Sequence, residues 1–107
     1  MANRILLALT NAVPGREDEF NRWYDDVHLG DVLKVPGIVS AQRFALTSIV
    51  DAPSPYAYLA IYEIEAERAD AIIESLQSAG NSMVLSDAMS GEAGAWLARA
   101  ITPVVQG

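Results

Sequence analysis

Residues 56–64, YAYLAIYEI, form a segment that is apolar on both of the faces that a β-strand would present. Successive side chains of a strand point to opposite faces, so Tyr58 and Tyr62 share one face while Leu59 and Ile61 share the other. The first charged residue comes only at the eighth of the nine positions. Such a strand is stable only when both faces are covered, so the fold has to supply cover on each side.

The rest of the chain predicts three further strands and two helices. Strands are predicted at 4–10, 38–47, 56–64 and 95–105, with amphipathic helices within 16–29 and 65–80. Residues 81–94 are ambiguous, a loop with or without one short helix. The order β-α-β-β-α-β predicts the ferredoxin-like α+β fold, an antiparallel four-stranded sheet with both helices on one face. At 107 residues, we expect a single domain spanning 1–107.

The last predicted strand is also apolar on both faces, with Trp96 on one face and Leu97 on the other. Two helices can cover only one face of a four-stranded sheet. A second copy of the chain is the simplest cover for the other face. We therefore expect a homodimer joined through its sheets.

Charge and composition exclude several classes of partner. The chain carries 14 acidic and 7 basic residues, a net charge of -7, and an acidic surface repels nucleic acid and anionic membranes. With no cysteine and one histidine, no metal site is expected. The N-terminal apolar run ILLAL is too short for a secretory signal, so we expect a cytoplasmic protein that begins at Met1. Hydrolase and nucleotide-binding glycine motifs are absent from the sequence.

The segment WYDDVHLGDVLKVPG, residues 23–37, places the one histidine near the expected end of the first helix. Gly30 is expected to weaken this helix, and Pro36 with Gly37 to stop the chain from continuing it. A helix C-terminus favours a nearby cation, so the pKa of His28 is expected to be raised.

On a helix, His28 lies one turn after Tyr24 and Asp25, and Asp31 follows it by three residues. A carboxylate that accepts a hydrogen bond from one imidazole nitrogen leaves the other nitrogen free as a base. The candidate catalytic residues are His28, Tyr24, Asp31 and Asp25. Structural roles stay open for each: a helix cap for His28, the N-cap of a short second helix for Asp31, and solvation for Asp25. Trp23 lies on the apolar helix face, either in the core or against a ligand.

Aromatic strand residues are expected to form one wall of a pocket. Tyr58 and Tyr62 share a sheet face, and Phe44 and Trp96 are predicted to join them, although packing in the dimer interface is an equal alternative. Arg43, between apolar neighbours, is a candidate for binding a substrate carboxylate or phenolate, or for pairing with a carboxylate of the second subunit. The candidate substrate-binding residues are Trp23, Arg43, Phe44, Tyr62 and Trp96.

One long motif carries a family resemblance. The pattern F-x-x-W-Y-x-x-x-H-L-x-D-V-L-x-x-P-G-I-V-x-A-x-R-F, residues 20–44, together with YLAIYEI, residues 58–64, resembles the dimeric α+β barrel superfamily. Within that superfamily the chain most resembles the EthD group, named for ethyl tert-butyl ether degradation. The motif departs from relatives at Gly30, where many have proline, and the C-terminal residues from 90 onward follow no pattern of the family.

The resemblance implies a ferredoxin-like monomer that pairs sheet to sheet, with a ligand cleft between the sheet and helices of each subunit. Members of the superfamily include cofactor-free monooxygenases acting on polyketide phenols, polyketide cyclases, muconolactone-type isomerases and haem-degrading enzymes. The chain has no second histidine to act as a haem ligand, so we expect no cofactor.

Two functions are therefore compatible with the sequence. The first is a cofactor-independent enzyme that acts by acid-base chemistry on a small apolar molecule, aromatic or polyketide-like, through cyclisation, isomerisation, lyase chemistry or oxygenation. The second is a non-catalytic protein that binds such a molecule or assists a degradation pathway. Both functions use the same cleft.

Overall fold

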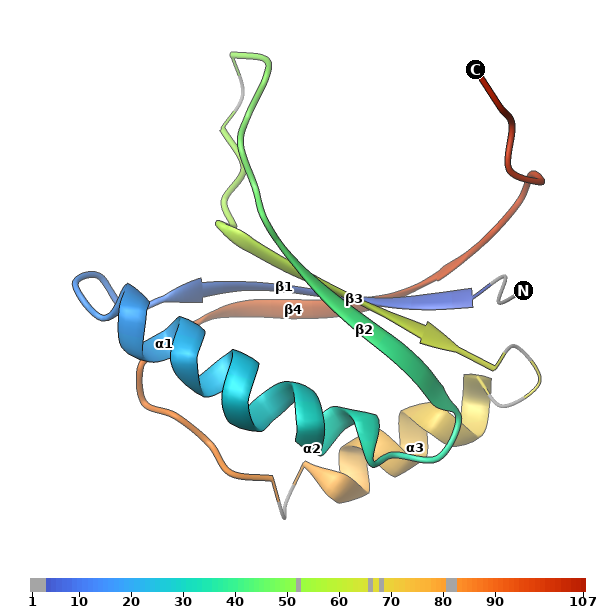
Figure 1. Ribbon diagram of the computed structural model, residues 1–107, viewed down its shortest axis with the longest axis horizontal. Helices are drawn as coiled ribbons and strands as arrows, with labels where there is room; N and C mark the ends of the chain where they lie inside the picture. The colour runs from blue at the N-terminus through green and yellow to red at the C-terminus, as the bar shows by residue number, and fades with distance from the viewer. Residues whose placement is uncertain (1–3, 52, 66, 68, 81–82) are drawn as a thin grey trace.

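The fold is built on a four-stranded antiparallel sheet, whose strands lie in the order β2-β3-β1-β4. The computed structural model describes residues 4–51, 53–65, 67, 69–80 and 83–107. The strands are β1 (Arg4–Ala12), β2 (Ile38–Ala45), β3 (Tyr58–Ile64) and β4 (Met89–Arg99). The helices lie on one face of this sheet (Figure 1). The predicted ferredoxin-like α+β fold is confirmed.

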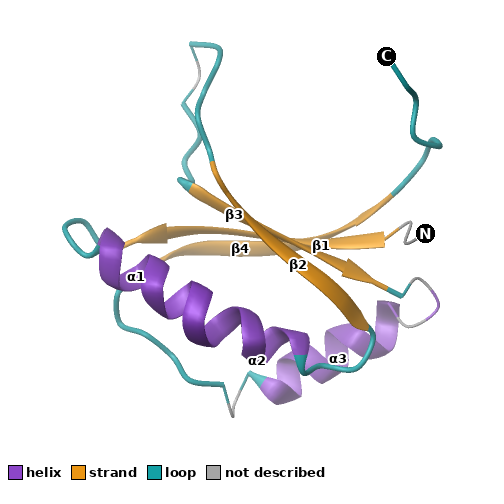
Figure 2. Ribbon diagram, viewed as in Figure 1, coloured by secondary structure: helices purple, strands orange, loops and turns teal. Residues whose placement is uncertain are grey.

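Two helical segments, coloured purple in Figure 2, connect the strands. Between β1 and β2, the elements α1 (Glu17–Trp23), η1 (Tyr24–His28) and α2 (Leu29–Leu33) follow one another directly. After β3, the chain forms α3 (Ala69–Ala79). Acidic residues occupy the first turn of α1, where the positive end of the helix dipole stabilises them.

The first helical run continues through Gly30, where we expected the helix to weaken. His28 has helical φ and ψ angles of -68° and -41°, and α2 continues beyond it. A glycine inside a helix costs about 1 kcal/mol. Burial of Val32 and Val35, 5% and 4% exposed, offsets that cost. The chain turns only around Gly37, which has a φ of 96°.

Helix continuity changes the predicted roles of two residues. Asp31 lies inside α2, so its predicted role as the N-cap of a separate helix is wrong. His28 lies within the run, one residue before α2 begins, so it does not cap a helix C-terminus. Both side chains are therefore available for contacts away from the helix ends.

The last strand begins earlier than predicted. It starts at Met89 and ends at Arg99, whereas the sequence pattern suggested 95–105. Small residues dominate its first half and give little β-propensity, but Ala12 and Met89 pair, so the strand forms against β1. Residues 100–107 are outside the sheet and extend away from it.

The core lies between the helices and one face of the sheet. Its largest fully buried side chains come from α1, β3 and α3, and they are Phe20, Tyr62, Ile64 and Ile72. Smaller residues such as Ala60 and Ala88 fill the space between them. Aromatic packing brings Phe20 within 5.4 Å of the Tyr58 ring, measured between centroids.

The other face of the sheet is also apolar, as the sequence predicted for β3. Antiparallel partners share a face, and Leu7 pairs with both Ile61 and Trp96, while Leu9 pairs with Leu59. None of the described helices covers these side chains, and Trp96 remains 49% exposed. The connection after β2 and the C-terminal segment both project on this side in Figure 1.

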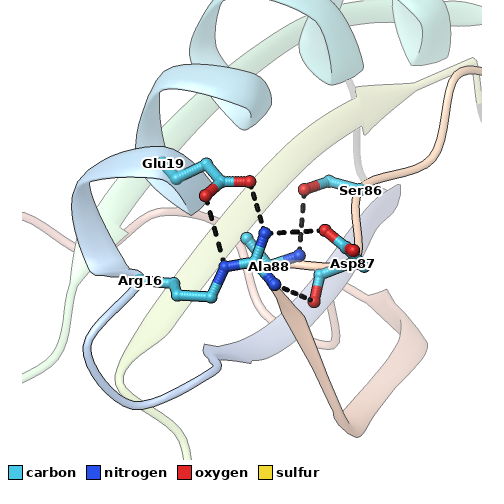
Figure 3. Close-up of polar contacts among 5 residues, drawn as sticks. All are labelled: Arg16, Glu19, Ser86, Asp87 and Ala88. Carbon is cyan, nitrogen blue, oxygen red and sulfur yellow. Dashed lines mark hydrogen bonds and ion pairs between the residues drawn. The ribbon is translucent and has the colours of Figure 1, made fainter.

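An ion-pair cluster holds the segment before β4 against the start of α1. Arg16 donates to Glu19 at 2.6 Å and to the carboxylate of Asp87 at 2.7 Å (Figure 3). The Arg16 guanidinium also donates to the backbone carbonyl of Asp87, and the Ser86 hydroxyl accepts from the N–H of Ala88. These contacts position the chain that runs past the helices toward β4.

Neighbouring isoleucines of α3 test the packing of this helix. Ile72 is 1% exposed, so Ile72→Ala should lower the free energy of unfolding by about 2–5 kcal/mol. Ile73 is 38% exposed, and Ile73→Ala should cost about 1 kcal/mol or less. Urea unfolding followed by circular dichroism measures both values. Equal costs would contradict the orientation of α3 on the sheet.

Candidate functional site

A π-helical turn positions the residues of the candidate site. In η1 the N–H of Leu29 bonds to the carbonyl of Tyr24, five residues earlier, in place of the four of an α-helix. The wider turn changes which side chains of the helix face one another. Single π-helical turns inside α-helices occur frequently at functional sites.

His28 is packed among aromatic rings. Its imidazole stacks on the indole of Trp23 with ring centroids 4.7 Å apart and planes inclined by 21°. The ring of Tyr24 meets it edge to face at 4.8 Å and 89°. The predicted proximity of His28 and Tyr24 is therefore present, and Trp23 covers one side of the imidazole.

Burial sets the protonation state of His28. Its Nδ1 atom is buried and has no hydrogen-bond partner among the residues that the structure describes. Burial lowers the pKa of His28, because removal from water disfavours the imidazolium. The carboxylate of Asp31 opposes this shift, and the positive charge of Arg43 adds to it. The raised pKa that we predicted is wrong, because the helix continues beyond His28.

Neither predicted carboxylate bonds to His28 in the described part of the chain. The carboxylate of Asp25 accepts from Arg43 at 2.7 Å, not from the imidazole. Asp31 accepts from the backbone N–H of Val84 at 3.2 Å and lies 3.7 Å from the ammonium of Lys34. Asp31 therefore influences the pKa of His28 through its charge alone and does not orient the imidazole ring.

Tyr24, whose ring contacts the imidazole, shares a buried hydrogen bond with Tyr62. The hydroxyl oxygens of Tyr24 and Tyr62 are 3.1 Å apart, and either one can donate. Burial raises the pKa of both phenols, so both are neutral at physiological pH. A neutral phenol keeps a proton that it can donate to a ligand oxygen.

The guanidinium of Arg43 packs against three aromatic rings, two from the helical run and one from β3. Its guanidinium carbon is 4.3 Å from the centroid of the Tyr24 ring and 5.6 Å from those of Phe20 and Tyr58. Besides Asp25, the guanidinium donates to the side-chain oxygen of Asn21 at 2.9 Å. Only 13% of the Arg43 side chain is exposed.

The predicted aromatic wall is split between two faces of the sheet. Tyr58 and Tyr62 face the helices. Phe44 pairs with Leu59, and Trp96 belongs to the same opposite face, so neither joins the tyrosines as we expected. Side chains alternate regularly along each strand. The prediction for Phe44 and Trp96 failed because it also required the register between different strands, which the sequence does not reveal.

Two contacts of the site were missed by the sequence analysis. Asn21 accepts a hydrogen bond from Arg43 and donates one to the hydroxyl of Tyr58. It precedes Asp25 by one helical turn, so the helical spacing could have identified it as a neighbour of the site. Val84 contributes its backbone, accepting from the indole N–H of Trp23 at 3.0 Å. No side-chain pattern identifies such a backbone contact.

Two hollows are lined in part by residues of the candidate site. A cavity of about 270 Å³ lies between α2 and α3 and is lined by Asp31, Lys34, Val35, Pro36, Ser75, Ala79 and Met83. A groove of about 410 Å³ lies beside β2 and is lined by Asn21, Asp25, Arg43, Phe44, Ala45 and Tyr58. Volumes of this size are typical of sites for small molecules.

Within the residues that the structure describes, histidine and acidic side chains do not gather in threes as a metal site would require. No helix in the same part of the chain has the length and apolar character needed to cross a bilayer.

Solved structures with the same fold are found, although no family model and no curated protein matches the chain. An EthD family protein from Bacillus halodurans has a TM-score of 0.62 and 14% identity over 94% of this chain and 100% of that one. The haem-degrader MhuD from Mycobacterium tuberculosis, with two haems in its active site, gives 0.67 and 13% over 95% and 99%. A monooxygenase from the gene ActVA-Orf6 of Streptomyces coelicolor, in complex with nanaomycin D, gives 0.55 and 15% over 99% and 94%.

These neighbours confirm, at the level of the fold, the resemblance to EthD-type proteins that the sequence indicated. The chain is thus a ferredoxin-like α+β protein whose structural neighbours include EthD-type proteins and monooxygenases.

The pKa of His28 can be measured without assignment, because the chain has one histidine. A single imidazole proton signal should titrate in one-dimensional NMR, with a midpoint below the ordinary value of about 6.5. The urea-unfolded chain is the control and should titrate near that ordinary value. A folded midpoint above it would contradict the burial of the ring.

The same shift gives a sign to the pH dependence of stability. A folded pKa below the unfolded one means that the unfolded chain binds the proton more tightly. The contribution of His28 to stability is therefore lost as the pH falls from the unfolded pKa toward the folded one. The carboxylates add their own pH dependence to the free energy of unfolding. The variant His28→Phe keeps this dependence but has no imidazole, so it is the baseline for the comparison.

Proposed function

We propose that the chain is a cofactor-independent enzyme that binds a small apolar molecule, aromatic or polyketide-like, and acts on it by acid-base chemistry. The observation that carries this proposal is the buried Nδ1 of His28, which has no hydrogen-bond partner among the described residues and whose ring contacts Tyr24, one of a pair of hydrogen-bonded, neutral tyrosines. Perturbed ionisable groups that lack a structural partner are typical of functional sites. The structural neighbours that act as monooxygenases support small-molecule chemistry on this fold.

His28 has the properties of a general base in this proposal. Its lowered pKa keeps the imidazole neutral at physiological pH, so Nδ1 can accept a proton from an acidic C–H or O–H of the ligand. The nearby Asp31 carboxylate then favours the imidazolium that forms. The hydroxyl pair of Tyr24 and Tyr62 supplies a proton or hydrogen bond to a ligand oxygen that gains negative charge.

Proton removal of this kind begins several reactions. A carbanion or phenolate formed at the ligand can cyclise, isomerise or expel a leaving group. It can also pass electrons to O₂, with the ligand itself as the reductant, which gives an oxygenation. The proposal therefore assigns the proton-transfer step to His28 and leaves the later steps to the chemistry of the ligand.

The proposed enzyme is a homodimer joined through the open face of its sheet. Support comes from the apolar side chains of β1 and β3 on this face and from the exposed Trp96 beside them. Exposed apolar surfaces of this kind mark interfaces, and a self-complementary sheet fits a twofold dimer. The proposed cytoplasmic location rests on the sequence.

A second function, ligand binding without turnover, is favoured by a specific observation. Nδ1 of His28 is buried, so a ligand reaches it only when a neighbouring ring moves. If the rings do not move, the imidazole is a packing group, and the hollows lined by Asp31 and by Arg43 only hold the ligand. Such a protein would sequester a small molecule or assist an enzyme of a degradation pathway.

Replacement of His28 separates the two functions. His28→Ala should leave the chain folded but reduce activity on the true substrate by about 10²–10⁴-fold, the usual contribution of one proton-transfer group. The matched control is Asp26→Ala, an exposed residue of the same helical turn, which should retain activity. Steady-state kinetics measures both, and the kcat/KM of the unmodified chain should fall at low pH with a pKa below about 6.5.

An unchanged kcat/KM in His28→Ala, with a lower melting temperature, would show that the imidazole contributes packing alone. Tyr24→Phe, which removes the hydroxyl but keeps the ring in its edge-to-face contact with the imidazole, is the companion variant. Binding that persists without any turnover in the unmodified chain would support the second function.

The dimer is tested by its mass in solution. The chain has a mass of 11.5 kDa, and sedimentation equilibrium at micromolar concentration should give twice that value. Leu7→Lys introduces a charge at the centre of the open face and should produce the monomer. A stable monomer of the unmodified chain would contradict the proposed interface.

A further inference from the structure

Arg43 is held in an unusual environment for a cation in an acidic protein. The side chain is 13% exposed, and three aromatic rings lie within 5.6 Å of its guanidinium carbon. Asn21 fixes the guanidinium by accepting one hydrogen bond, and its own amide is held by the hydroxyl of Tyr58. The positive charge is therefore rigidly placed and largely removed from water.

The counter-ion of Arg43 is placed differently. Asp25 accepts a 2.7 Å hydrogen bond from the guanidinium, but its own side chain is 58% exposed. When Asp25 leaves, its carboxylate regains full hydration by a change of rotamer. Arg43 regains less hydration, since the surrounding rings leave only 13% of its side chain exposed. The pair is thus asymmetric: the arginine needs an anion, and Asp25 is an exchangeable one.

The place that an exchanging anion would occupy opens into the groove beside β2. This groove, of about 410 Å³, is lined by Arg43, Asp25 and Asn21 at its polar end and by Phe44, Ala45 and Tyr58 along its walls. A site with one fixed charge and apolar walls selects a ligand that has an anionic head on an apolar body. Arginine binds a carboxylate through two parallel hydrogen bonds.

We propose that this groove binds an aromatic carboxylate, whose carboxylate replaces Asp25 at Arg43 while its ring packs against Tyr58. Asp25 then acts as an internal competitor that occupies the site until a ligand arrives. This part of the proposal rests only on the contacts of Arg43 and does not require that the protein is an enzyme.

The link to chemistry rests on the proposed function. Arg43 lies over the ring of Tyr24, and the edge of that ring meets His28. A ligand held at Arg43 is thus separated from the imidazole by one aromatic ring, and it binds the guanidinium whose positive charge lowers the pKa of His28. The substrate class of the enzyme would accordingly be aromatic carboxylates.

Calorimetric titration with 2-naphthoate tests the site, and 2-naphthamide is the uncharged probe of the same shape. Asp25→Asn removes the competitor and should tighten 2-naphthoate binding by about two- to five-fold, the change that corresponds to one exposed ion pair. Asp26→Asn is the matched control, because it alters the net charge equally but lies outside the lining of the groove. It should leave the affinity within error of the unmodified chain.

Arg43→Met should weaken 2-naphthoate binding by about ten-fold or more, since a charge-assisted contact is lost. The affinity for 2-naphthamide should change little in Asp25→Asn. If Arg43→Met does not fold, the comparison of Asp25→Asn with Asp26→Asn still decides the matter.

Three results would overturn the proposal. They are equal effects of the two aspartate variants, equal binding of the acid and the amide, and no saturable binding of 2-naphthoate to Asp25→Asn at millimolar concentration. His28→Ala should bind 2-naphthoate as the unmodified chain does. Loss of turnover in that variant with intact binding therefore tests the proposed function separately from the anion site.

Discussion

Tyr24 connects the helical run to the sheet, to the charged Arg43 and to the neutral His28. Its hydroxyl bonds to Tyr62 on β3, its ring lies under the guanidinium of Arg43, and the edge of the ring meets His28. The side chain is 2% exposed, so these three contacts share one desolvated position. Because an aromatic ring can satisfy a cation on its face and a hydroxyl partner at its tip, one residue fixes the geometry of all three neighbours.

The environment around Tyr24 explains why the site is electrostatically perturbed. Removal from water raises the pKa of Tyr24 and Tyr62 and lowers that of His28, so all three groups are held in their neutral forms. The two charges nearest to them, on Arg43 and Asp31, act on His28 in opposite directions. Neutral acids beside a neutral base are a suitable arrangement for proton transfer near pH 7.

The sequence predicted the order of strands and helices well, because long segments with a clear period determine it. The apolar character of both faces of β3 was correct for the same reason. The helix continues past the weakening expected at Gly30 because tertiary burial of Val32 outweighs the modest cost of a glycine. The start of β4 was missed because its first residues are small and take their conformation from pairing with β1.

The candidate site was predicted only in part. Spacing along a helix brought His28 and Tyr24 together correctly. Spacing also suggested a carboxylate partner for His28, but Asp25 faces a strand residue, Arg43, which lies 18 positions away and whose position depends on how the sheet packs on the helix. Contacts between elements depend on register and packing, and a single sequence reports neither directly.

The central claim is that Nδ1 of His28 carries an unpaired lone pair in a buried aromatic setting. An unpaired buried N–H donor is rarer than an unpaired acceptor, so the proton should reside on Nε2. The most direct measurement is the ¹⁵N chemical shift of the two ring nitrogens of the labelled protein at neutral pH. The account predicts an unprotonated Nδ1 and a protonated Nε2. A protonated Nδ1, as the neutral tautomer or as the imidazolium, would contradict it.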